Sequence, residues 1–215
     1  MALDRSDVIE LYRRRARRYD FTANLYYLIG FRIEAYRRAA VAGLALGSGD
    51  TVVDIGCGTG LNFRLLERAV GNRGRVIGVD ATDAMLDQAR RRVEREGWTN
   101  VELVSCDAAR FDFPPELGGV LSTFALTLVS EYDAVIERGA RALRAGGRWV
   151  VADLKLPGWP GARLCARALV PLYRPFAVTL DLASRHPWES MATHMKTCTL
   201  SPRFFGFAYV ATGEA

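Results

Sequence analysis

Short apolar runs alternate with amphipathic stretches between residues 51 and 155 of this chain. The runs are nearly continuous and rich in Val, which is typical of strands buried on both faces of a parallel sheet. They span residues 51–56, 75–80, 101–107, 118–126 and 148–154. The stretches between them carry apolar positions at three- and four-residue spacing, which predicts helices at 61–70, 84–96 and 133–143.

The segments outside this core complete the expected fold. Residues 196–200 and 204–212 are predicted to form a terminal strand pair, with Pro202 marking the turn. The whole pattern predicts an α/β fold with a doubly wound, mostly parallel sheet of seven strands. Ahead of the core, residues 4–20 and 31–46 are expected to be helical, so that residues 1–46 form a lid over a domain spanning 47–215. Residues 156–194 hold five prolines and are expected to form an insertion that faces substrate or a membrane.

Composition limits the classes of protein that fit. The chain has 215 residues, 50% of them hydrophobic, and a mean hydropathy of +0.02, as expected for a globular domain. No apolar run approaches 18 residues, and the first 20 residues are polar and rich in Arg, so we expect neither a membrane span nor a secretory signal. The four cysteines and two histidines form no metal-ligand pattern, so we expect free thiols, no metal and a cytoplasmic location.

The net charge of +5 is unevenly distributed. Residues 1–38 hold nine arginines against five acidic residues, and residues 159–178 hold three arginines and no acidic residue. The basic charge therefore lies in the two segments that flank the core.

The most specific motif is Val-Val-Asp-Ile-Gly-Cys-Gly-Thr-Gly at residues 52–60, which leaves a predicted strand and opens a predicted helix. Glycines at 56, 58 and 60 allow a tight turn and a close approach of backbone to ligand. Dinucleotide sites have the spacing G-x-G-x-x-G, whereas this loop has G-x-G-x-G with Asp54 before it. A carboxylate there would repel a pyrophosphate and favours a cationic ligand, such as an α-amino group or a sulfonium.

Acidic residues also end the next two predicted strands. Asp80 lies 20 residues after Gly60, where an acid can accept both hydroxyls of a ribose. Asp107, followed by Ala108, can accept from the exocyclic amine of an adenine. All three acids are expected at the crevice where open α/β sheets bind ligands.

With these residues the chain resembles the class I S-adenosylmethionine-dependent methyltransferases, which have a Rossmann-like fold, over about residues 34–155. The resemblance implies S-adenosylmethionine as cofactor and S-adenosylhomocysteine as product. Asp54–Gly60 would hold the methionine part, Asp80 the ribose and Asp107 the adenine, while residues 122–125 would lie beside the transferred methyl. The predicted cofactor-binding residues are Tyr19, Asp54, Gly56, Cys57, Gly58, Gly60, Asn62, Asp80, Ala81, Met85, Asp107, Ala108 and Thr123.

The flanking segments suggest the methyl acceptor. Residues 19–38, 56–62 and 201–209 are similar to the quinone-biosynthesis methyltransferases and their lipid-methylating relatives, most of all to the short bacterial phosphatidylethanolamine N-methyltransferases. This resemblance implies N-methylation of phosphatidylethanolamine and its mono- and dimethyl forms towards phosphatidylcholine. C-methylation of a demethylated quinone precursor and a soluble small-molecule acceptor are the alternatives. We expect a monomer and no nucleic-acid partner.

The basic segments predict contact with an anionic membrane surface. If residues 4–19 are one helix, an apolar stripe of Val8, Tyr12, Ala16 and Tyr19 lies opposite Arg14, Arg17 and Arg18. Arg163 and Arg167 repeat this arrangement in the second segment. Basic amphipathic helices lie in membrane interfaces, so we expect a peripheral protein on the inner face of the cytoplasmic membrane.

Candidates for the chemistry come from the same flanks. The amine of phosphatidylethanolamine must lose a proton before attack, and Tyr19 and Tyr27 are the predicted catalytic residues. His194 is an alternative base, although a structural role is expected for it. The predicted substrate-binding residues are Tyr27, Arg32, Arg174 and Lys196.

Overall fold

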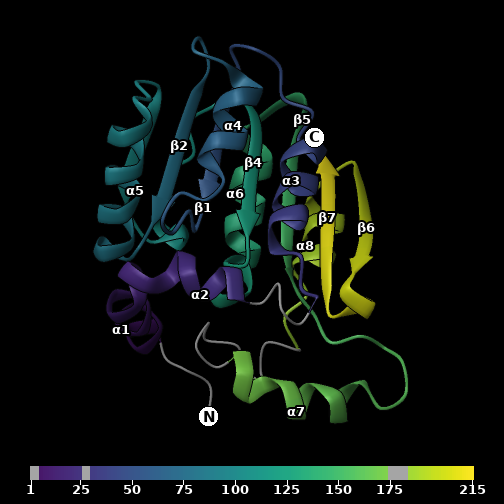
Figure 1. The fold of residues 1–215 in the computed structure, drawn as a ribbon. Helices are drawn as coiled ribbons and strands as arrows, with labels where there is room; N and C mark the ends of the chain where they lie inside the picture. The colour runs from purple at the N-terminus through teal and green to yellow at the C-terminus, as the bar shows by residue number, and fades with distance from the viewer. Residues whose placement is uncertain (1–4, 26–29, 174–183) are drawn as a thin grey trace.

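The computed structural model describes residues 5–25, 30–173 and 184–215, and its centre is a sheet of seven strands (Figure 1). The strand order is β3-β2-β1-β4-β5-β7-β6, in which β1 to β5 run parallel and β7 runs antiparallel to both of its neighbours. The predicted seven-stranded, mostly parallel sheet is confirmed. The strands are β1 Thr51–Ile55, β2 Arg75–Asp80, β3 Val101–Ser105, β4 Leu117–Thr123, β5 Leu143–Leu154, β6 Thr197–Arg203 and β7 Ala208–Glu214.

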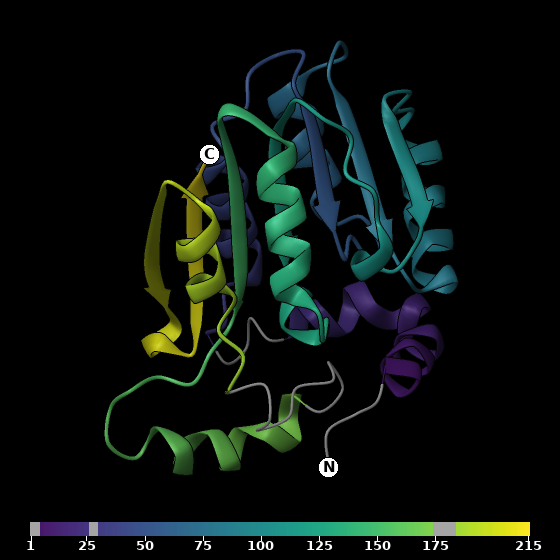
Figure 2. The same cartoon turned by 180° about the vertical axis from the view of Figure 1, so that it is seen from behind.

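Helices cover both faces of the sheet (Figures 1 and 2). One face carries α3, α4 and α5, and the other carries α6 and α8. Two further helices, α1 and α2, lie across the carboxyl edge of the parallel strands, and α7 lies farther out beyond the same edge. The helices are α1 Arg5–Arg15, α2 Tyr19–Leu25, α3 Ile33–Gly43, α4 Phe63–Val70, α5 Asp83–Glu96, α6 Tyr132–Ala142, α7 Ala162–Tyr173 and α8 Pro187–His194.

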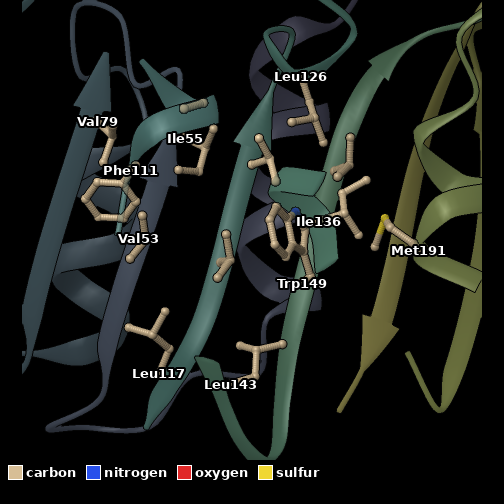
Figure 3. Packing of buried hydrophobic residues seen from close by; sticks show 14 of the residues in the cluster. Val53, Ile55, Val79, Phe111, Leu117, Leu126, Ile136, Leu143, Trp149 and Met191 are labelled. Atoms are coloured by element: carbon tan, nitrogen blue, oxygen red, sulfur yellow. The ribbon is translucent and has the colours of Figure 1, made fainter. Parts of the chain in front are cut away.

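The core explains why the central strands read as continuous apolar runs. Every residue of β4 is buried, and Trp149 of β5 is fully buried against the α6 side of the sheet (Figure 3). Helix α6 approaches closely because Gly139 faces this ring: a Cβ at that position would lie 2.0 Å from the indole. Large side chains on the strands and small ones on the helix fix the distance between the layers.

The structure differs from the predicted elements in several places: β5 begins at Leu143 rather than at 148, and β4 ends at Thr123 rather than at 126. Two further differences lie nearer the ends of the chain. The predicted helix over residues 4–20 is interrupted by a short 3₁₀ turn at Ala16–Arg18, where the chain bends around the edge of the sheet. Pro202 lies inside β6 rather than in a turn, and the turn is the 3₁₀ segment Phe204–Gly206. A proline is tolerated there because β6 is an edge strand, so its missing N–H costs no ladder hydrogen bond.

In the part of the chain that the structure describes, no helix is long and apolar enough to cross a membrane.

Candidate functional site

A cleft opens at the carboxyl edge, between the ends of the parallel strands and α1. It holds about 1000 Å³ of empty space including its open mouth, which is in the size range of a small-molecule site. Ten of the thirteen predicted cofactor-binding residues line it: Tyr19, Gly56, Cys57, Gly58, Asp80, Ala81, Met85, Asp107, Ala108 and Thr123. The other three, Asp54, Gly60 and Asn62, lie behind its wall.

The glycine loop after β1 forms the floor of the cleft. Gly56, Gly58 and Gly60 have φ values of 67°, 55° and 76°, in the left-handed region that favours glycine. A Cβ on Gly56 would lie 2.3 Å from the Cβ of Ala125. The loop therefore tolerates no larger residue at Gly56, and its backbone faces the cleft directly.

Asp80 at the end of β2 is held in place by backbone amides. Its Oδ2 accepts from the Gly58 N–H at 2.9 Å, and its Oδ1 accepts from the Thr82 N–H at 2.8 Å. Burial raises the pKa of Asp80, and these two hydrogen bonds oppose the shift. The carboxyl group lines the cleft at the predicted ribose position.

A buried polar network lies behind the glycine loop. Asn62 donates from Nδ2 to both carboxylate oxygens of Asp54, at 3.1 and 3.0 Å, and to the Thr123 hydroxyl at 3.0 Å. Arg37 donates to the Asn62 side-chain oxygen at 3.0 Å and to Thr123. Burial raises the pKa of Asp54 to about 7, while the Asn62 hydrogen bonds and the Arg37 charge oppose the shift.

Arg37 is a site residue that the sequence does not single out. It is 6% exposed, lines the cleft, and its Nε has no hydrogen-bond partner in the structure. A signal was present, because Arg37 occupies the apolar face of α3, four residues after Ile33 and three before Ala40. A buried guanidinium needs compensating negative charge nearby, and Asp54 supplies only part of that charge.

The N-terminal helices close one side of the cleft. Val8, Tyr12 and Tyr19 line it, and Ala16 is buried. The predicted apolar stripe therefore faces the cleft, and the prediction that this stripe lies in a membrane is wrong. Arg14, Arg17 and Arg18 are exposed, and Arg14 pairs with Glu10 at 2.8 Å.

Polar contacts attach these helices to the rest of the site. Asp20 of α2 accepts from the hydroxyl of Thr59, in the glycine loop, at 2.6 Å and also pairs with Arg92 of α5. Arg13 donates from Nε to Asp83 at 3.0 Å. The first helical segment is thereby connected to both sides of the cleft.

Tyr19 is not suited to act as a base, because its phenol keeps its proton. Burial raises the pKa of its phenol, and the nearby Arg37 only partly opposes the shift. Tyr19 is therefore a protonated hydrogen-bond donor at neutral pH. Its ring lies 6.0 Å from that of Tyr12.

The remaining predicted residues are scattered. Arg32 is exposed at the start of α3, and Arg163 and Arg167 are exposed on α7. The prediction that Lys196 binds substrate is wrong, because β6 runs in the direction of β5 and Lys196 precedes it, at the edge opposite the cleft. Tyr27 and Arg174 lie outside the described residues.

The structure supports neither His194 as a base nor a metal site in its described part. The His194 imidazole lies 3.6 Å from Asp133 and is not among the residues that line the cleft. Among the described residues, no cluster of His, Cys, Asp or Glu side chains is placed to hold a metal ion.

The chain is similar to methyltransferases in sequence. Residues 52–147 match the family described as methyltransferase domain. The 2-phytyl-1,4-naphtoquinone methyltransferase of Thermosynechococcus vestitus is 34% identical over 123 residues, which are 57% of this chain and 54% of that protein. The ubiquinone/menaquinone biosynthesis C-methyltransferase of Pseudomonas putida is 32% identical over 152 residues, which are 70% of this chain and 59% of that protein. The chain thus spans little more than half the length of these curated relatives.

The fold is shared with solved methyltransferases. Geranyl diphosphate C-methyltransferase from Streptomyces coelicolor, solved with S-adenosyl-L-homocysteine, superposes with a TM-score of 0.63 at 17% identity. The superposition covers 84% of this chain and 78% of that one. At this identity the likeness concerns the fold alone.

Proposed function

We propose that this protein is an S-adenosylmethionine-dependent methyltransferase whose acceptor is a ring carbon of a quinone with an apolar tail. The proposal starts from its match to the methyltransferase domain and from the fold it shares with the class I enzymes. The acceptor class rests on the curated relatives, of which two methylate quinones by name at 32–34% identity. The order of acceptors predicted from the sequence is thereby reversed. Phosphatidylethanolamine finds no support among these relatives and becomes the second candidate.

The cleft fits the proposed cofactor by its own chemistry. Gly56 and Gly58 line the cleft without side chains, the carboxyl group of Asp80 lies where a ribose would bind, and the buried guanidinium of Arg37, whose Nε has no hydrogen-bond partner, supplies positive charge for an α-carboxylate. Asp54, behind the loop, supplies negative charge for an α-ammonium or a sulfonium. When bound, the cofactor supplies a methyl group already activated on a positively charged sulfur.

One part of the cleft lining is apolar and supports an apolar acceptor. Val8 and Ile9 of α1 and Leu128 and Val129 after β4 line this part of the cleft, together with the ring of Phe124. These side chains suit a flat ring and a hydrocarbon tail, because burying apolar surface is favourable.

The residues of the chain would position the acceptor rather than form bonds to it. A quinol becomes a carbon nucleophile as its hydroxyl proton passes to water at the open mouth of the cleft, and the charge that develops on its oxygen can accept from Tyr19. The ring carbon would take the methyl group as the carbon–sulfur bond of the cofactor breaks, and the proton of that ring carbon would then pass to water. Helices α1 and α2 shield the reacting atoms from the rest of the solvent. Tyr19 thus takes the role of a donor in place of the base predicted from the sequence.

One observation favours the second candidate. Tyr12 and Tyr19 present two rings 6.0 Å apart at the cleft, and tyrosine faces attract methylated ammonium groups. Such a pair would suit the headgroup of phosphatidylethanolamine and of its methylated forms.

The test is methyl transfer with labelled S-adenosylmethionine. Purified protein receives either a detergent-solubilised demethylated prenyl quinol or vesicles of phosphatidylethanolamine. We expect label in the quinol. Label in the phospholipid alone would make phosphatidylethanolamine the acceptor and reject the quinol. Label in neither, with cofactor binding intact by calorimetry, would overturn both candidates.

A further inference from the structure

The turn between β6 and β7 holds an aromatic ring out into solvent at the carboxyl edge. Phe205 is 84% exposed, although a Phe ring is normally buried. Phe204, Phe205 and Gly206 all have left-handed backbones, with φ values of 45°, 54° and 87°. Bulky residues adopt this region at a cost, and such strain persists only where surrounding contacts impose it.

Contacts of Phe204 and of the Phe205 carbonyl impose this backbone. The ring of Phe204 points inward and packs edge-on against Phe31, 5.2 Å between centroids. The indole Nε1 of Trp159 donates to the carbonyl oxygen of Phe205 at 3.1 Å. With its neighbour anchored and its carbonyl held, the Phe205 side chain is directed away from the protein.

Two more apolar side chains are exposed in the segment that contacts Phe205 through Trp159. Trp159 is 41% exposed, and Leu164, in the first turn of α7, is 72% exposed. The Ala162 N–H donates to the Trp159 carbonyl at 3.2 Å, which keeps the start of α7 next to the indole. We call Phe205, Trp159 and Leu164 the apolar corner.

The charged residues of the segments that form the apolar corner have one sign. Arg163 and Arg167 are exposed on α7, and Arg203 precedes the turn. Residues 154–180 and 190–213 contain no Asp or Glu. Exposed aromatic and aliphatic side chains in segments whose charged residues are all basic match the two layers of an anionic lipid interface, apolar chains below charged headgroups.

The apolar corner is also connected to the cleft. Phe31 packs against Phe204 on one side and against Phe124 on the other, with 5.8 Å between the latter centroids, and Phe124 lines the cleft. Helices α1, α2 and α7 and the turn after β6 all lie at this one edge of the sheet (Figure 1).

We propose that the apolar corner and its arginines form a docking surface for an anionic lipid bilayer, with Phe205 inserted among the acyl chains. This surface takes the membrane-binding role that the sequence suggested for the apolar stripe of α1, because that stripe lines the cleft. Delivery of an apolar acceptor from the bilayer to the cleft rests on the proposed function, whereas docking does not.

The experiment is vesicle sedimentation with phosphatidylcholine vesicles that contain or lack phosphatidylglycerol. We expect binding only with the anionic lipid, and a loss of about tenfold in Phe205→Ala, because a buried aromatic side chain contributes that much or more. The double variant Arg163→Ala, Arg167→Ala should lose about fivefold per arginine and reduce the salt dependence. Leu200→Ala and Arg141→Ala are matched controls, exposed on β6 and α6 outside the surface.

Four outcomes would contradict either membrane docking or the proposed function. Binding unchanged in Phe205→Ala, with an unchanged melting temperature, would overturn the proposal. Binding of an RNA or DNA oligonucleotide that depends on the arginines and not on Phe205 would also overturn it. Methyl transfer to a detergent-solubilised quinol without vesicle binding overturns docking alone, and vesicle binding without any methyl transfer overturns the proposed function alone.

Discussion

Asp54 illustrates how burial prepares a carboxyl group for a ligand. It is fully buried, and its pKa of about 7 leaves it partly protonated at neutral pH in the ligand-free protein. A nearby cation favours the ionised form, because opposite charges attract strongly in a low dielectric. The residue before the glycine loop is therefore poised to ionise when a cationic ligand arrives.

This gives a pH dependence of defined sign. Cofactor binding should release a proton and tighten as the pH rises from about 6 to 8, since only ionised Asp54 attracts the cation across the glycine loop. Stability without ligand should fall as the pH rises from the unfolded pKa of 3.8 to the folded value of about 7, because the native state then keeps a proton that the unfolded state loses. Calorimetry in buffers of different ionisation enthalpy measures the release. Asp54→Asn should abolish it, and an unchanged release in that variant would contradict the assignment.

Asp80 and Asp87 form a matched pair of acids. Asp80 lines the cleft, whereas Asp87 is exposed on α5 and pairs with Arg90. Asp80→Ala should weaken cofactor binding at least tenfold, because it removes an acceptor of ribose hydroxyls. Asp87→Ala should leave the affinity unchanged. Equal dissociation constants for Asp80→Ala and wild type by calorimetry would refute the ribose placement.

Arg37 and Arg38 are adjacent, yet only one reaches the site. Arg38 pairs with Glu34 on the surface of α3, whereas Arg37 is buried in the Asp54 network. Arg37→Gln should weaken S-adenosylmethionine binding about tenfold by removing a charge-assisted contact, and Arg38→Gln should not. With decarboxylated S-adenosylmethionine the loss in Arg37→Gln should disappear. A similar loss with both compounds would assign Arg37 to structure rather than to the carboxylate.

Single residues show why the site could be predicted only in part. The glycine loop, Asp80 and Asp107 follow strands whose carboxyl ends must converge, so their meeting follows from topology. Arg37 lies on a helix outside the repeating pattern, and its direction depends on the packing of α3. Lys196 looked equivalent to other basic residues until the strand direction placed it at the opposite edge.

At the scale of elements, the break between α1 and α2 has a consequence for the cleft. A continuous helix over residues 4–20 would run straight, whereas the turn at Ala16–Arg18 redirects the chain so that Asp20 reaches Thr59. Apolar spacing alone did not predict this break, because Val8, Tyr12 and Tyr19 fit one helical stripe equally well. The contact with Thr59 is what distinguishes the bent arrangement.

Asp20 should therefore govern how fast the cleft opens. Asp20→Ala removes the hydrogen bond to the glycine loop and the pair with Arg92, so the cofactor should dissociate about tenfold faster. Glu10→Gln, which removes only the exposed pairs with Arg13 and Arg14, serves as the control. Stopped-flow release measures both rates. Equal rates for Asp20→Ala and wild type would mean that α2 does not limit opening.

At the scale of the whole molecule, the ligand-binding edge joins parts that are distant in sequence. The cleft is lined by α1, the loop after β1, the end of β2 and the segment after β4. The described helices of both basic segments, α1 and α2 of the first and α7 of the second, lie at this edge, although the two segments are more than a hundred positions apart. The uneven charge was visible in the sequence, but its convergence required the strand order.

A ligand that contacts all these parts should stabilise the entire fold. At a concentration of 100 times its dissociation constant, it adds about 2.7 kcal/mol to the free energy of unfolding. For a chain of this length, each kcal/mol shifts the melting temperature by about 2–4 °C, so S-adenosylhomocysteine should raise it by about 5–11 °C. At the same concentration, a tenfold weaker Asp80→Ala retains about 1.4 kcal/mol and so about half of the rise. Thermal unfolding followed by circular dichroism measures both shifts. A full rise in Asp80→Ala would place the ligand elsewhere, and no rise in the wild type would remove the cofactor from this edge.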